Sequence, residues 1–321
     1  TLTTAGGVIF INSAHATTLG GNDNNTISYN KIHGTNTVPS TFPAIGIAAV
    51  GTTTTTNTYN DNCSIINNHI YDYFLAGSAS TGIKVDVGNT AWNISSNRLF
   101  QTTALTHTAA VGHRGIWVTP NIGSISNAAN GFTINNNYIG GNDANATGDY
   151  VVTSTSAITF MGLDISVGLG TATEIQGNTI NKISFTTSST ATNAFSGIGI
   201  FNGNNNVGNT TANVIGDPTV NTVPYGITFT TTANLGGVMA IRASSAGNQN
   251  ISNNMIGGIE LRGNNTTVVP SFAGINYSGG GSAIINGNTI GSATLANSIN
   301  ISTSGATTTT NTADFLGVWV S

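Results

Sequence analysis

The chain has 321 residues, of which only 18 are Asp, Glu, Lys or Arg, and its formal net charge is −4. This charged share of 6% is far below the roughly 25% of ordinary globular domains, so the composition offers no basic surface for nucleic acid. No apolar run approaches the roughly 18–20 residues of a membrane-spanning helix. We therefore predict neither a nucleic-acid partner nor a membrane span.

The residues that take the place of charge are 52 Thr, 45 Asn and 41 Gly. Thr is β-branched and favours strands, while Gly and Asn tolerate the positive φ of tight turns. Because 38% of the residues are hydrophobic and recur at regular places, the composition indicates an ordered all-β protein rather than a disordered chain. No linker interrupts the pattern. We predict a single domain over 1–321, with rungs in 7–320 and an extended arm in 1–6.

Short strands with alternating apolar residues, often led by Gly, recur along the chain. This period of two is typical of β structure with one face turned inward. The strands are expected at 7–11, 45–50, 82–87, 115–118, 157–165, 197–201, 238–243, 273–277 and 316–320.

A second motif, apolar-x-x-Asn-x-apolar, alternates with these strands; FTINNNYIG at 132–140 is one copy. Seven intact copies recur about every 37 residues, and a degraded copy at 214–220 carries Asp217 and Pro218 at its turn. The first apolar position is Ile27, Ile65, Ile94, Ile134, Ile175, Ile251 and Ile285. The Asn position is Asn30, Asn68, Asn97, Asn137, Asn178, Asn254 and Asn288.

Self-similarity at a near-constant interval predicts a β-solenoid, in which each rung buries its apolar face only by stacking on its neighbours. We expect the seven isoleucines to form one stack in the core. The asparagines suit the bend between two strands, since Asn can adopt the αL conformation and bond to the Asn above and below in a ladder. Polar insertions such as 52–61 and 102–114 are predicted to be surface loops, whose extra length costs little closure entropy.

These repeats resemble those of the right-handed parallel β-helices of the pectate-lyase-like superfamily, as found in exported bacterial surface proteins. The resemblance covers about 7–320 and implies a single-stranded, right-handed parallel β-helix of about 8–9 rungs with long polar loops. The superfamily includes lyases, hydrolases, tailspikes and adhesins, so the resemblance is specific for the fold and weak for activity.

Catalytic groups are sparse. Glycoside hydrolysis needs two carboxylates roughly 5–9 Å apart, and the one pair that outward strand positions bring near each other is Asp86 and Asp164. A lyase needs a basic residue, for which Arg98 and Arg114 are the candidates, with His113 beside Arg114 in an expected loop. For each of these, a solvated surface role is the alternative interpretation, and we predict no catalytic residue.

Metal and cofactor signals are equally weak. His15, His33, His69 and His107 lack metal-ligand spacing. The turns GGNDNN at 20–25 and GGNDAN at 140–145 share some features of calcium-binding repeats without repeating in tandem. We predict no metal and no cofactor, with calcium as an unsupported option. Cys63 is the only cysteine, which excludes an intrachain disulfide.

Neither end of the sequence shows a capping segment, and an open rung exposes unpaired backbone groups. The expected assembly ends are Val8, Ile9, Phe10, Ile11, Phe315, Leu316, Val318, Trp319 and Val320. Two alternatives follow: the sequence is an excerpt of a longer solenoid, or copies stack head to tail, which would give a filament. The sequence therefore favours a structural subunit of an extracellular bacterial filament or surface appendage, with copies of itself as partner.

The alternative is an adhesin or tailspike-like module that binds an extracellular polysaccharide, and an active lyase or hydrolase is less favoured. Aromatic side chains that stack on sugar rings would support the alternative. The candidates are Trp92, Trp117, Tyr71, Tyr73 and Tyr138.

Overall fold

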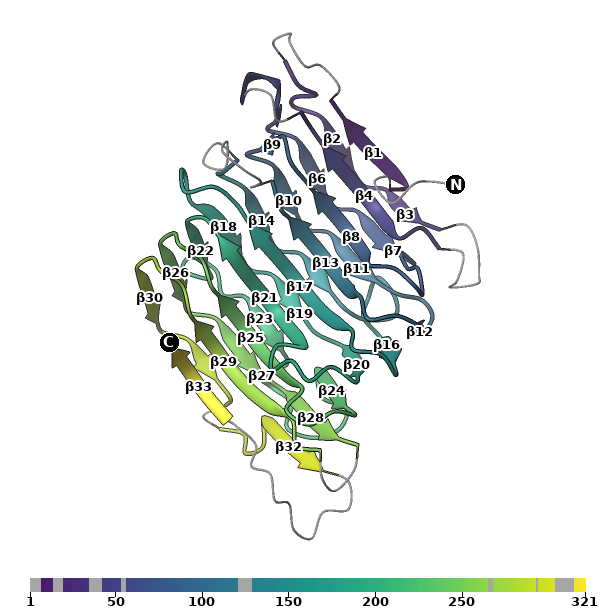
Figure 1. Cartoon of the computed structure of the whole chain (residues 1–321), viewed down its shortest axis with the longest axis vertical. Coiled ribbons are helices and arrows are strands. Elements are labelled where there is room, and N and C mark those ends of the chain that lie inside the picture. The colour runs from purple at the N-terminus through teal and green to yellow at the C-terminus, as the bar shows by residue number, and fades with distance from the viewer. Residues whose placement is uncertain are drawn as a thin grey trace.

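The computed structural model describes residues 7–13, 20–34, 42–52, 56–120, 129–264, 268–292, 294–303 and 315–321. The predicted arm at 1–6 and His15 lie outside these residues. The described chain is almost entirely β-strand, with one 3-10 helix of three residues, η2 (Thr56–Thr58). All strand pairs are parallel, and successive rungs stack from the N-terminal strands at one end of the molecule to β33 at the other (Figure 1). The fold is a parallel β-helix.

Each rung passes through three sheets in the order A, B, C. Sheet A consists of β1 (Ile9–Asn12), β4 (Ile45–Val50), β8 (Ser80–Val85), β13 (Gly112–Val118), β17 (Thr159–Ser166), β21 (Phe195–Asn202), β25 (Gly237–Ala243), β29 (Ser271–Tyr277) and β33 (Phe315–Val320). Sheet B consists of β2 (Thr26–Ser28), β6 (Ser64–Ile66), β10 (Asn93–Ser95), β14 (Thr133–Asn135), β18 (Thr173–Gln176), β22 (Asn205–Val207), β26 (Gln249–Ser252) and β30 (Ala283–Asn286). Sheet C consists of β3 (Lys31–His33), β7 (His69–Tyr71), β11 (Arg98–Phe100), β15 (Tyr138–Ile139), β19 (Thr179–Ile180), β23 (Val214–Gly216), β27 (Met255–Gly257) and β31 (Thr289–Ile290).

A fourth sheet occupies part of the sequence that was predicted to be polar loop. Sheet E consists of β12 (Leu105–His107), β16 (Tyr150–Ser154), β20 (Ile183–Thr187), β24 (Ile227–Thr231), β28 (Ile259–Gly263) and β32 (Ile299–Thr303). The loop prediction for 102–114 was therefore wrong, because Leu105 and His107 point inward and pair with the next rung. The insertion at 52–61 likewise contains η2 and β5 (Asn60–Asp61), which pairs with β9 (Asn89–Thr90) in the two-stranded sheet D.

The core consists of columns of like side chains that run through the stacked rungs. In sheet B, registered pairs join Ile27, Ile65, Ile94, Ile134, Ile175, Val207, Ile251 and Ile285 in that order. Ile65 through Ile251 in this column are fully buried. Burial of each such side chain contributes roughly 1.5–3 kcal/mol. Burial is complete only where a rung lies on both sides, so stability depends on stacking.

The bend between sheets B and C differs from the prediction in one respect. Positive φ falls on the residue before the motif Asn and not on the Asn itself, as at Tyr29, Asn67, Ser96 and Asn136. Gly177, Asn253 and Gly287 repeat this conformation. The motif Asn therefore has ordinary backbone geometry, and its side chain is the recurring requirement.

Candidate functional site

The motif asparagines form a continuous chain of amide hydrogen bonds through the molecule. In the central rungs, the backbone N–H and the Nδ2 of Asn97 both donate to Oδ1 of Asn137, at 3.1 and 3.0 Å. Asn137 donates in the same way to Asn178. Its Nδ2 also donates to the carbonyl of Ile94 at 2.8 Å. The ladder runs through Asn30, Asn68, Asn97, Asn137, Asn178, Asn213, Asn254 and Asn288.

Asn213 is a member of this ladder that the sequence reasoning missed. The copy assigned to 214–220 begins earlier, because Val207 fills the isoleucine position and Asn213 the Asn position. The segment between Val207 and Asn213 is three residues longer than in other copies, and the Gln176 side chain forms hydrogen bonds with its backbone. Oε1 of Gln176 accepts from the N–H groups of Thr210 and Thr211, at 3.1 and 3.2 Å. The spacing Asn-x-Ile at 213–215 was the signal that could have found it.

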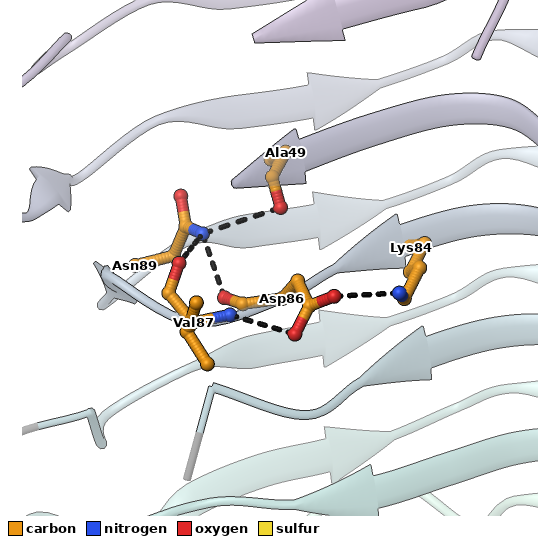
Figure 2. A network of polar contacts seen from close by, with 5 residues as sticks. All are labelled: Ala49, Lys84, Asp86, Val87 and Asn89. Carbon is orange, nitrogen blue, oxygen red and sulfur yellow. Dashed lines mark hydrogen bonds and ion pairs between the residues drawn. The ribbon is translucent and has the colours of Figure 1, made fainter. Parts of the chain in front are cut away.

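The carboxylate pair considered for hydrolysis is not a pair in the structure. Asp86 follows β8 and binds Nζ of Lys84 at 2.5 Å, while its Oδ1 accepts from the Val87 N–H (Figure 2). Beside it, Nδ2 of Asn89 donates to the carbonyls of Asp86 and Val87, at 2.7 and 2.9 Å. The register aligns Asp164 with Trp117 and Lys84 instead. Asp86 therefore closes a turn.

Asp164 lies in its own ion pair on the outer face of sheet A. Nε of Arg114 donates to its Oδ2 at 2.6 Å, and the Asp164 side chain is largely buried. Burial raises the pKa of Asp164, and the Arg114 guanidinium opposes that rise. The ring of Trp117 has Lys84 Nζ at 4.6 Å and Arg114 Cζ at 4.4 Å from its centroid. These contacts tie the Arg114, Trp117 and Asp164 side chains to one another across two rungs.

The predicted loop cluster of His113 and Arg114 was wrong. Both residues lie on strand β13, where neighbours point to opposite faces, and His113 is in the core with no exposed surface. Burial first, and then the neighbouring His107 and Arg114, hold the pKa of His113 well below its ordinary value of 6.5. His113 is therefore a neutral core residue at pH 7.

His113 belongs to a buried polar chain that crosses the core. Its Nε2 bonds to the Tyr150 hydroxyl, which lies 3.1 Å from the Tyr73 hydroxyl, and its Nδ1 lies 3.4 Å from Nε2 of His107. Nδ1 of His107 lies 3.3 Å from the Ala76 carbonyl, which only accepts. That contact places a proton on His107 Nδ1, so Nε2 of the neutral His107 accepts from Nδ1 of His113.

The pH dependence of stability should follow from this chain. Because the folded-state pKa of His113 lies below the unfolded value, the unfolded state binds more protons, and stability is lost as pH falls below about 6.5. We expect His113→Phe to cost about 1–3 kcal/mol at pH 8, where Tyr150 and His107 lose a partner. The deficit should shrink by about 1.4 kcal/mol for each pH unit between about 6.5 and 5. Urea unfolding at both pH values measures it.

Asp61 titrates in the same pH range, but it does not affect the comparison of the two proteins. Burial and then the nearby Asp23 raise its pKa to about 6, so its contribution has the opposite sign and grows as pH falls below about 6. It is present in both proteins and cancels in the difference. Parallel pH profiles for the two proteins would show that the imidazole of His113 does not titrate with unfolding.

In both turns considered for ions, the Asp carboxylate accepts hydrogen bonds from backbone N–H groups. In 20–25, Oδ1 of Asp23 accepts from the Asp61 N–H at 2.9 Å. In 140–145, Oδ1 of Asp143 accepts from the N–H groups of Asn145 and Thr147, at 2.8 and 3.2 Å. Across the described residues, no group of three or more His, Cys, Asp or Glu side chains is placed to hold a metal.

The aromatic candidates divide by burial. Trp92 and Tyr73 are fully buried, so they cannot stack on a sugar. Trp117, Tyr71 and Tyr138 are partly exposed. Tyr71 lies between His33 and Phe100, at centroid distances of 4.4 and 4.6 Å, and Arg98 covers one face of Tyr138. Cys63 is buried and free, and its Sγ contacts the Asn22 carbonyl.

The two outermost strands of sheet A expose apolar side chains. Exposure is 45% at Phe10, 54% at Phe315 and 64% at Val320. In the rungs between them, the columns of Ile47, Ile83 and their successors are fully buried. No described strand pairs with the outer edges of β1 and β33.

These features define a parallel β-helix protein with an internal amide ladder. The described residues include no helix of the length and hydropathy that crossing a membrane requires. No protein-family model, curated protein or solved structure shows a significant match to this chain.

Proposed function

We propose that the chain is a non-catalytic structural subunit of an extracellular bacterial filament or surface appendage, in which rungs of successive copies stack end to end. The observation that carries the proposal is the exposure of Phe315, Val318 and Val320 in columns whose inner members are buried. Exposed edge strands pair readily with further strands. The resemblance to pectate-lyase-like repeats, with their right-handed coil and surface location, belongs to the same proposal.

The register supports stacking of one copy on another. Inward positions of sheet A run from Ile9 and Ile47 at one end to Ile275 and Val318 at the other. A second copy that adds its β1 strand to β33 would continue the column with a like residue. A heterologous contact of this kind does not close, so it generates a filament.

The expected result is that the purified chain forms fibres at high concentration and that Val318→Lys raises the critical concentration at least about tenfold, or about 1.4 kcal/mol per contact. Val223→Lys is the matched control, since Val223 is 68% exposed in a turn of the lateral surface. Negative-stain microscopy and sedimentation measure both. A chain that stays monomeric without fibres, or equal effects of the two substitutions, would contradict the proposal.

The alternative function is a polysaccharide-binding adhesin or tailspike-like module, and the partly exposed Trp117 with its two cations favours it. A glycan array with the Trp117→Ala variant as comparison tests this alternative. Hydrolase or lyase activity has less support, because Asp86 and Asp164 are each held in a separate ion pair.

A further inference from the structure

The outer face of sheet C carries three nitrogen-bearing side chains in one column. The register pairs Lys31 with His69 and His69 with Arg98, so they occupy three successive rungs roughly 4.7–4.9 Å apart. Lys31 and Arg98 are exposed, and His69 is partly exposed. We call these three residues the cation column.

None of the ion pairs in the described chain involves a residue of the cation column. Among the described residues, Lys84, Arg114 and Arg262 form the ion pairs of the chain, and neither Lys31 nor Arg98 takes part in one. Asp72, which follows β7, accepts instead from the N–H and hydroxyl of Thr102, at 2.9 and 2.8 Å. The column thus keeps its positive charge on a chain of net charge −4.

Placing these groups in register costs free energy in the isolated rod. Lys31 and Arg98 each lie directly opposite His69, one on either side, and their charges disfavour its protonation. Burial first, and then Lys31 and Arg98, lower the pKa of His69. The neighbouring rings add no acid: Phe100 is edge-on to His69 at 6.3 Å, and the Arg98 guanidinium lies 4.7 Å from the Tyr138 ring centroid. A bound anion would relieve this repulsion.

We propose that the cation column is a binding site for tetrahedral oxyanions, namely sulfate or phosphate ester groups on an extracellular polymer, with the anion over His69 between Lys31 and Arg98. Three donors on three successive rungs match an anion with three or more acceptor oxygens better than a planar carboxylate with two. The stacking of Arg98 on Tyr138 leaves the edge of the guanidinium available for hydrogen bonds. The site is independent of filament formation, since it lies on the side of the rod.

The test uses the full chain and polymers with one backbone: dextran, carboxymethyl dextran and dextran sulfate, with inorganic sulfate as the free ion. The imidazole resonances of His69 are titrated by NMR with each probe. Because an anion favours the protonated ring, dextran sulfate should raise the pKa of His69 by about one unit. Lys31→Gln and Arg98→Gln should each weaken binding about tenfold, as expected for loss of one charge-assisted hydrogen bond.

Lys182→Gln is the matched control, because Lys182 is a cation outside the column that also forms no ion pair in the described chain. It should leave affinity within about twofold. An equal loss in this variant would show general attraction of a polyanion and overturn the site. Equal binding of carboxymethyl dextran, or binding of inorganic sulfate alone, would overturn the ester assignment. Fibre formation by the Lys31→Gln variant is measured as well. A variant that binds dextran sulfate weakly but still forms fibres shows that the anion site and the proposed filament function are tested separately.

Discussion

Asn137→Ala should lower the free energy of unfolding by about 3–4 kcal/mol. The Asn137 side chain is 1% exposed. Its Oδ1 accepts from the backbone N–H and the Nδ2 of Asn97, and its Nδ2 donates to the Ile94 carbonyl and to Oδ1 of Asn178. Its removal leaves the Asn97 N–H and the Ile94 carbonyl without that partner inside the protein. Each buried polar group left unsatisfied costs roughly 1–3 kcal/mol. Urea unfolding followed by circular dichroism measures the loss.

Asn30→Ala is the matched control at the other end of the same ladder. Asn30 is exposed and donates to Asn68, and no described Asn in an outer rung donates to it. The Asn68 Oδ1 keeps the backbone N–H of residue 30 as a donor. The substitution should therefore cost less than about 1 kcal/mol. If the two substitutions cost the same, the ladder would not contribute through its buried hydrogen bonds.

Gly162→Ala should lower the free energy of unfolding by about 2–3 kcal/mol. An added Cβ at this position would lie 2.6 Å from the Gly197 carbonyl oxygen and 3.0 Å from Cδ1 of Ile180. Gly162 occupies the place where sheet A approaches the isoleucine column of sheet C, and the rigid backbone carbonyl cannot move aside cheaply. Alanine also restricts the unfolded chain, which favours folding by about 0.4–1 kcal/mol and offsets a small part of the cost.

Ala240→Gly is the control, because Ala240 is the residue whose carbonyl an added Cβ at Gly197 would contact, and it already carries a methyl group in the same column. Its loss should cost no more than about 1 kcal/mol. Thermal unfolding of both variants gives the comparison. A Gly162→Ala protein as stable as the parent would show that sheets A and C separate easily, and the repeated glycine would then need another explanation.

The repeat was readable because its signals are local. In each intact copy, the Asn lies three positions after the Ile, as at Ile134 and Asn137, across a single bend, and stacking then places each copy over the next. The missed copy shows the limit of this reading. At Val207 and Asn213, the extra residues broke the spacing, although the tertiary contacts remain the same.

Sheet E escaped prediction for a related reason. Its strands are rich in Thr and Ser and follow segments of variable length, so no constant interval marks them. The alternation of Ile183 with Phe185, and of Ile227 with Phe229, was present in the sequence and corresponds to buried inward positions. The lengths of the insertions concealed that these residues align.

The sequence by itself determined the all-β class, the stacking of isoleucine on isoleucine and the need for an amide at each bend, because these depend on composition and on distances of a few residues. Only the tertiary structure decided which chemistry each polar residue meets. His113 and Arg114 are neighbours in the chain yet lie on opposite faces, while Lys31, His69 and Arg98 come together from three rungs. Strand pleat and register set these relations, and both arise from pairing between distant segments.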